Sequence, residues 1–283
     1  MKIVVSFSGG KDSQACLIQA VEKYGSDKVE AVFCDTGWEH PATYRHVEDT
    51  TRLLKVKLTV LTGKYSFVSL AKHKNRFPSV KARFCTEELK IKPMIDWVLS
   101  RTESLIIIQG IRSGESNARA AMETECMYFQ NYFTAINGKK YSYRKKEVLE
   151  WCKNYDASIL RPIKDWSSQD VIDCILNHNQ LPNPLYYRGF KRVGCFPCIM
   201  CRLKEIELIS RDPDEVEKLI KAEEFVGSSF FSTDTIPERF YKDKNKPCVQ
   251  DVIKYVTDKT ATLDMFEPEG GYSCMSLFHG LCE

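Results

Sequence analysis

The first half of the chain alternates short runs of β-branched and other apolar residues with amphipathic segments. The runs are KIVVSF (2–7), KVEAVFCDTG (28–37), KLTVLTG (57–63) and SLIIIQGIR (104–112). Such alternation is typical of βαβ units on a parallel sheet. Because the runs are almost continuously apolar, we expect helices on both faces of that sheet. The sequence therefore predicts a doubly wound, mainly parallel α/β fold, in which ligands bind at the carboxyl ends of the strands.

The second half of the chain has a different pattern. Residues 122–158 are rich in aromatic and basic side chains, with Asn137-Gly138 as a tight turn, and we interpret them as an insertion. A cysteine-rich segment at 195–201 precedes a polar, largely helical tail. We therefore expect an α/β domain over residues 1–205 and a helical C-terminal extension over residues 206–283.

The charge balance and the lengths of the apolar runs indicate which compartment and which partners to expect. Its 41 Lys and Arg residues nearly balance 38 Asp and Glu residues, so net charge neither requires nor excludes a nucleic-acid partner. No apolar run is long enough to cross a bilayer, and the first run is too short for a signal peptide. We expect a cytoplasmic protein with no membrane partner. In that compartment, 12 cysteines favour metal-binding or reactive thiols over a disulfide framework.

A polar, glycine-containing stretch, SFSGGKDS (6–13), separates the first expected strand from a helical pattern. The first amides of a helix lack intrahelical partners, and the helix dipole favours an anion there. Gly9 and Gly10 allow the backbone to approach a phosphate, and Lys11 adds a positive charge. The stretch therefore predicts a phosphate site, although it lacks the Walker spacing. The remaining candidate residues are Ser6, Ser8, Ser13 and Asp12, which can cap the helix or hold a hydrated metal ion.

The motif SGGKDS resembles the pyrophosphate loop (PP-loop) of the adenine nucleotide α-hydrolase-like superfamily. Further motifs resemble the phosphoadenosine phosphosulfate (PAPS) reductase family, and the likeness runs through most of the first 205 residues. It implies a binding site for adenylylsulfate (APS), PAPS or ATP, with Mg²⁺ if ATP is the substrate. The motifs are DTGWEHPATYRHVED (35–49), CTEELKIKP (85–93), GIRSGESNAR (110–119) and RPIKDW (161–166).

The resemblance assigns substrate-binding roles outside the PP-loop. It places Lys90 at the anionic group of the substrate, where a lysine acts as a point charge. Arg112 and Arg119, in the loop that begins at Gly110, suit bidentate contacts with sulfate or phosphate, and solvated surface arginines are the alternative. Asp35 either orients a hydroxyl group or a metal ion, or serves only the geometry of its turn.

The segment GCFPCIMC (194–201) can wrap three thiolates around one metal centre. Its GCxPC portion is similar to the cluster-binding segment of iron–sulfur APS reductases, whose other ligands are an adjacent cysteine pair before the lysine-proline motif. This chain has Cys85-Thr86 at that place, so Cys201 is the candidate replacement. We expect a 4Fe-4S cluster, with zinc or unligated buried thiols as alternatives. The expected ligands are Cys85, Cys195, Cys198 and Cys201.

The C-terminal stretch SCMSLFHGLCE (273–283) partly resembles the mobile tail of the reductase family, whose cysteine attacks the sulfur of the substrate. The likeness implies that Cys282 or Cys274 is the nucleophile and that a thioredoxin-type thiol releases the product. A thiolate at this position would be favoured by nearby basic side chains. The alternative is that both cysteines are buried by the tail or are extra metal ligands.

Two enzymatic functions fit these features, and Lys11 is a catalytic candidate in both. The first is thiol-dependent reduction of APS or PAPS to sulfite. The second is an ATP pyrophosphatase that adenylates DNA, RNA or another acceptor for sulfur insertion from a sulfur donor, which the intact PP-loop favours. A nucleotide-dependent binding module is a third, non-enzymatic alternative. Nucleic acid is a candidate partner because basic and aromatic residues interleave at 132–146 and basic residues recur at 73–83, although such runs are usually solvated faces.

Overall fold

The computed structural model describes residues 1–127, 143–241 and 245–258 of the 283-residue chain. Within these residues the central sheet has the strand order β3-β2-β1-β4-β6-β5. All neighbouring strands are parallel except β5, which is antiparallel to β6. The strands are β1 (Lys2–Ser6), β2 (Val29–Asp35), β3 (Lys57–Thr62), β4 (Leu105–Ile108), β5 (Glu125–Met127) and β6 (Ala157–Leu160).

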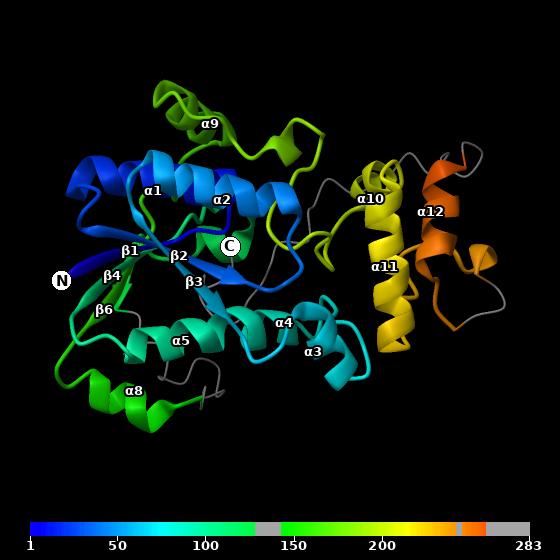
Figure 1. Ribbon diagram of the computed structural model, residues 1–283, viewed down its shortest axis with the longest axis horizontal. Helices are drawn as coiled ribbons and strands as arrows, with labels where there is room; N and C mark the ends of the chain where they lie inside the picture. Colours follow the sequence, from blue (N-terminus) through cyan, green and yellow to red (C-terminus); the bar gives the residue numbers. More distant parts are fainter. Residues whose placement is uncertain (128–142, 242–244, 259–283) are drawn as a thin grey trace.

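Helices cover both faces of the sheet (Figure 1). On one face lie α1 (Lys11–Tyr24), α2 (Pro41–Leu53) and α9 (Ser168–Asn177), and on the other lie α5 (Lys92–Leu99) and α8 (Lys145–Trp151). Successive strand residues alternate between the two apolar cores: Val5 packs with the α1 side and Val4 with the α5 side. This arrangement confirms the doubly wound α/β fold.

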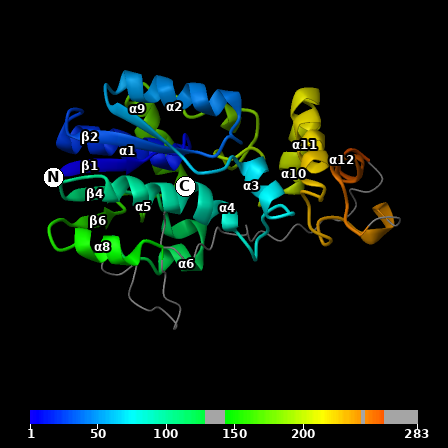
Figure 2. The same ribbon diagram turned by 60° about the horizontal axis from the view of Figure 1, so that its bottom comes forward.

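Three helices of the C-terminal extension lie beyond the carboxyl ends of the strands (Figures 1 and 2). Leu70, Leu219 and Val252 are buried in one apolar core that joins these helices to α3. The described part of the extension therefore packs continuously against the α/β domain. The elements are α3 (Phe67–His73), α10 (Leu203–Ile209), α11 (Pro213–Val226) and α12 (Val249–Thr257).

Short elements connect these layers. They are α4 (Phe84–Thr86), the π-helical turn Glu87–Ile91, α6 (Asn117–Ala120) and the 3₁₀ turns Ser113–Glu115, Pro184–Tyr186 and Glu238–Phe240. The described part of the expected insertion contributes β5 and α8, whereas the Asn137-Gly138 turn lies outside the described residues. Among the helices of the described ranges, none combines the length and apolar character that a membrane span requires.

The loop after β4 approaches the start of α1 closely, and Gly110 makes this approach sterically feasible. A Cβ atom on Gly110 would lie 2.7 Å from the Ser13 nitrogen and 2.8 Å from the carbonyl carbon of Asp12. Neither atom can move without displacing the first turn of the helix. Gly110 is thus required by backbone packing. The PP-loop meets the loop 110–119, which carries Arg112 and Arg119 and is called the arginine loop below, at this contact.

We predict that Gly110→Ala destabilises the protein, because the added methyl group collides with backbone atoms. The free energy of unfolding should fall by about 1–3 kcal/mol, the usual cost of overpacking. Gly114→Ala is the matched control in the same loop, since no heavy atom lies within 4 Å of the Cβ position there. Urea denaturation of both variants measures the effect, and equal stability of the two variants would contradict the assignment.

Candidate nucleotide-binding site

The PP-loop is held in shape by its own serines and by α2. Gly9 has a φ of +79°, and a Cβ atom there would lie 2.8 Å from Cγ2 of Thr43. The Ser13 hydroxyl donates to the Gly10 carbonyl oxygen at 3.0 Å and accepts from the Ser8 amide at 3.2 Å. Ser13 is 1% exposed, so its role in this structure is to fix the loop.

The first turn of α1 has backbone N–H groups that no carbonyl group of the same helix accepts. Gly10 is the N-cap residue and has no side-chain cap, and its amide donates to the Ser8 hydroxyl at 3.4 Å. The Lys11 amide donates at 3.1 Å to the hydroxyl of Tyr186, a residue that the sequence interpretation did not single out. Oxygen acceptors thus occupy the positions at which the sequence predicts phosphate oxygens.

Three cationic side chains near the loop, those of Lys11, Arg112 and Arg119, are paired with carboxylates. The Lys11 ammonium group lies 2.7 Å from an Asp12 oxygen, and Arg112 Nε donates to the other oxygen of the same carboxylate. Arg119 pairs with Glu115, which also lies 3.9 Å from Arg112. Arg112 and Arg119 are 7% and 4% exposed. They are therefore buried behind acidic partners, and the surface-arginine alternative does not hold.

A cavity of about 130 Å³ brings the PP-loop and the cysteine segment together. The expected site residues that line it are Ser8, Gly10, Asp12, Lys90, Cys85, Cys195 and Cys198. Ser6 and Lys90 also line a smaller adjoining hollow. The wall further contains residues that sequence reasoning did not assign, namely Thr36, Thr86, Glu115, Tyr186, Lys191, Arg192 and Val193, together with Arg83 from the second basic stretch.

The turn Asp35-Thr36-Gly37 follows β2. Its side chains hold the shape of the turn, and Thr36 lines the cavity. The Asp35 carboxylate accepts hydrogen bonds from the Gly37 amide and the Tyr44 hydroxyl, each at 2.7 Å. Burial, reinforced by the bond to Asp35, raises the pKa of Tyr44 above its ordinary value. Both contacts favour the turn-shaping alternative for Asp35. The buried Glu39 carboxylate accepts from the amide and the hydroxyl of Thr36, at 3.2 and 2.6 Å.

The cysteine segment lies against this turn. Cys195 Sγ is 3.7 Å from Oε1 of Glu39 and 3.6 Å from the Thr36 hydroxyl. Burial raises the pKa of the Cys195 thiol to about 12, against the opposing charge of Lys90, and burial also raises the pKa of Cys201. Cys201 packs against the apolar core that contains α10 and α11.

Four thiols have the soft-donor chemistry that iron–sulfur clusters and zinc prefer. In the described ranges, however, the structure places no three His, Cys, Asp or Glu side chains closely enough to hold a metal ion. Cys85, Cys195 and Cys198 share one cavity wall without converging on a common point. Cys274 and Cys282 lie outside the described residues, as does most of the basic and aromatic stretch at 132–146.

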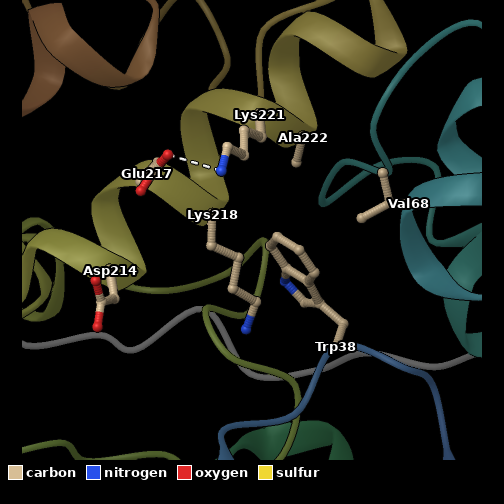
Figure 3. A pocket seen from close by; sticks show the side chains of 7 residues that line it. All are labelled: Trp38, Val68, Asp214, Glu217, Lys218, Lys221 and Ala222. Atoms are coloured by element: carbon tan, nitrogen blue, oxygen red, sulfur yellow. Dashed lines mark ion pairs between the residues drawn. The ribbon is translucent and has the colours of Figure 1, made fainter.

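A second hollow, of about 400 Å³, lies between α3 and α11 (Figure 3). Trp38 and Val68 form its apolar side, and Glu217 and Lys221, one turn apart on α11, pair along its rim at 2.7 Å. Lys218 lies over the Trp38 ring, 4.5 Å from the ring centroid. This hollow contains none of the nucleotide-binding or metal-ligating candidates that the sequence indicated.

Comparison of the sequence with models of protein families identifies the family of this chain. The model of the phosphoadenosine phosphosulfate reductase domain matches residues 2–201, which include the PP-loop, the arginine loop and the cysteine segment. The chain belongs to the phosphoadenosine phosphosulfate reductase domain family. The matched region ends at Cys201, directly before α10.

Relatives of this PAPS reductase family member include proteins without an assigned function. It is 28% identical to an uncharacterized 37.8 kDa protein of Escherichia phage 186, over 99% of this chain and 96% of the phage protein. It is 31% identical to an uncharacterized protein of Methanocaldococcus jannaschii, over 74% of this chain but only 38% of that protein. It is 24% identical to an adenosine 5'-phosphosulfate reductase of Streptomyces coelicolor, over 60% of this chain and 61% of the reductase.

A solved PAPS reductase from Candida auris, in a phosphate complex, aligns with a TM-score of 0.48 at 16% identity. That alignment covers 70% of this chain and 83% of the reductase.

Asn183, immediately before the 3₁₀ turn of Tyr186, ties this segment to the PP-loop. Its side-chain amide donates to the Gly9 carbonyl oxygen at 3.2 Å and to the Thr43 hydroxyl at 3.3 Å, and the residue is fully buried. Asn183 and Tyr186 belong to the stretch NPLYYRGFKRVGC (183–195), which leads directly into the cysteine motif. This adjacency was the available sequence signal.

We predict that Asn183→Ala lowers the free energy of unfolding by about 1–3 kcal/mol, because it leaves the buried Gly9 carbonyl group without this donor. Affinity for nucleotide should fall as well, since the loop loses its tether. Asn154→Ala, at an exposed turn after α8, is the control and should change neither property. Denaturation and calorimetric titration with ATP measure both. Retention of wild-type stability by Asn183→Ala would contradict the tethering role.

Proposed function

We propose that the protein is an enzyme that binds an adenine nucleotide with its anionic tail at the PP-loop, and that it reduces APS or PAPS to sulfite at the expense of thiols. One observation carries the proposal: a single cavity is lined by the start of α1, by Lys90 and by three cysteines. Family membership and the likeness to an adenosine 5'-phosphosulfate reductase support it.

The charges at the cavity suit a sulfate or phosphate ester. Lys90, Arg83, Lys191 and Arg192 line its wall, against the two carboxylates of Asp12 and Glu115. The cationic excess favours an anion, and the backbone donors of the first α1 turn provide fixed dipoles beside it. Lys11 would offset the negative charge that develops on the departing nucleoside phosphate.

The chemistry requires a nucleophilic thiolate, which we assign to Cys282, with Cys274 as the alternative. The thiolate attacks the sulfur of the adenylated sulfate, an S–S bond forms, and the S–O bond breaks with its electron pair leaving on the nucleoside phosphate. A second thiol, from a thioredoxin-type reductant, then attacks the cysteine sulfur. That step releases sulfite and leaves a disulfide, so the thiols are oxidised and the sulfur is reduced.

We predict that anaerobic protein supplied with thioredoxin and APS or PAPS releases sulfite and AMP or 3'-phosphoadenosine 5'-phosphate. Cys282→Ser should lower the rate at least about 100-fold, because a hydroxyl group cannot replace the thiolate as nucleophile. Cys152→Ser, at the end of α8, is the matched control and should retain activity. Sulfite is measured with a fluorogenic thiol-reactive dye. Full activity of both Cys282→Ser and Cys274→Ser would refute the thiol mechanism.

A second candidate function is an ATP pyrophosphatase that activates an acceptor for sulfur insertion. The observation that favours it is the complete SGGKDS loop, in which Asp12 lines the cavity and can hold Mg²⁺ beside a triphosphate. Nucleic acid is the candidate acceptor, since Arg83 brings the basic stretch at 73–83 to the cavity. Pyrophosphate released from ATP and Mg²⁺ in the presence of DNA or RNA, without sulfite from APS or PAPS, would replace the first proposal with this one.

We further propose that Cys85, Cys195, Cys198 and Cys201 ligate a 4Fe-4S cluster in the cell. When bound, such a cluster supplies one-electron redox chemistry. Its assembly would draw together thiols that already line or adjoin one cavity wall. Because the buried Cys195 and Cys201 thiols have raised pKa values, metal binding must release their protons.

We predict that anaerobically purified protein contains about four iron atoms per chain and absorbs broadly in the visible range. Cys201→Ser should lower the iron content by at least about half, because it removes one of the cluster ligands. Cys152→Ser should leave it unchanged. Elemental analysis and acid-labile sulfide provide the measurement. Stoichiometric zinc without visible absorbance would instead assign a zinc site, and absence of both metals would refute the proposal.

A further inference from the structure

The Tyr186 hydroxyl is hydrogen-bonded to a backbone amide that the proposed nucleotide would also use. Its hydroxyl oxygen accepts from the Lys11 amide at 3.1 Å, and a Cβ atom on Gly10 would lie 3.4 Å from the same oxygen. The phenol group thus reaches the first turn of α1 from a segment 175 residues away. Tyr186 also lines the cavity that contains Lys90 and Cys195.

The position of Tyr186 is fixed without its hydroxyl group. Asn183 donates to the PP-loop and accepts from the Leu185 amide at 3.0 Å, and Leu185 is fully buried. These contacts anchor the 3₁₀ turn from Pro184 to Tyr186 through other side chains. Removal of the hydroxyl alone should therefore leave the turn in place and release the Lys11 amide from this contact.

The hydroxyl and an anion compete for the same donor. An N–H group donates well in one direction, so the Lys11 amide cannot serve Tyr186 and a phosphate oxygen with good geometry at once. A bond to an ionised oxygen is about twice as strong as a bond to a neutral one, which favours exchange once the anion is present. The exchange nevertheless costs the amide–phenol bond.

We propose that the Tyr186 hydroxyl is a displaceable stand-in for a phosphate or sulfate oxygen, and that it sets the affinity of the PP-loop for anions. The proposal rests on the proposed function, because it assumes that the anionic tail binds at the Lys11 amide. Tyr186 is a specificity-determining residue in this scheme: anions with enough charge to displace its hydroxyl bind, and weakly charged ones are disfavoured.

The segment that leads to the cysteine motif lies beside the same turn of α1. Residues 191–195 follow Tyr186 closely and line the same cavity, and the Val193 carbonyl oxygen lies 3.6 Å from the Cβ position of Gly10. An anion at the PP-loop would therefore lie in the same cavity as Cys195.

The test compares wild type, Tyr186→Phe and Tyr187→Phe as full chains, with inorganic pyrophosphate as the probe in calorimetric titrations. Tyr187 is the matched control because it is adjacent in sequence and 67% exposed. We expect Tyr186→Phe to bind pyrophosphate about 3- to 10-fold more tightly, since no hydroxyl has to be displaced. Tyr187→Phe should stay within about twofold of wild type.

Stabilisation by pyrophosphate in urea denaturation is the second measurement, and it should be larger for Tyr186→Phe than for wild type. Unchanged or weaker binding by Tyr186→Phe, with wild-type binding intact, would overturn this inference and leave the proposed nucleotide site standing. Absence of pyrophosphate and nucleotide binding in all three proteins would overturn both.

Discussion

The structure of the site depends on the ion pair between Asp12 and Arg112. Asp12 lies in the first turn of α1, Arg112 follows β4, and their buried side chains meet close in sequence to the contact between Gly110 and Ser13. A buried carboxylate and guanidinium each carry a large desolvation cost, which their mutual contact offsets. The pair therefore fixes two strand-end loops relative to each other, and Lys11 and Glu115 extend the same network on either side.

The sequence was sufficient to predict the architecture, and several of its candidate site residues lie along one cavity. Strands with continuous apolar runs predict helices on both faces of the sheet. The two apolar cores, one on each face, confirm this prediction. Motifs that follow β1, β2 and β4 had to meet because carboxyl ends of parallel strands share one edge. Ser8, Asp12 and Lys90 consequently line the cavity that the motifs predicted, together with Cys195 from a distant segment.

The detailed roles could not be derived in the same way, because they depend on which partner reaches each group. Arg112 and Arg119 were expected to face a substrate, but the folded chain supplies Asp12 and Glu115 as partners. Asp35 lies at the end of a strand, as a residue that orients a substrate hydroxyl group or a metal ion would, but its carboxylate accepts hydrogen bonds from Gly37 and Tyr44. Tyr186 lies too far along the chain for any local pattern to connect it with Lys11. Long-range contacts of this kind are determined by packing, which a single sequence does not reveal.

Trp38 connects the cysteine segment with the helical extension. Its indole NH donates to the Pro197 carbonyl oxygen at 3.0 Å, its ring stacks on Phe67, and Lys218 of α11 reaches past it to the Phe196 carbonyl oxygen at 3.2 Å. The backbone of the cysteine segment is thus held from behind by Trp38 and by one side chain of α11. Shortening the protein to its family-matched region, residues 2–201, would keep the Trp38 bond and remove the Lys218 bond, so α11 supplies part of the support behind the thiols.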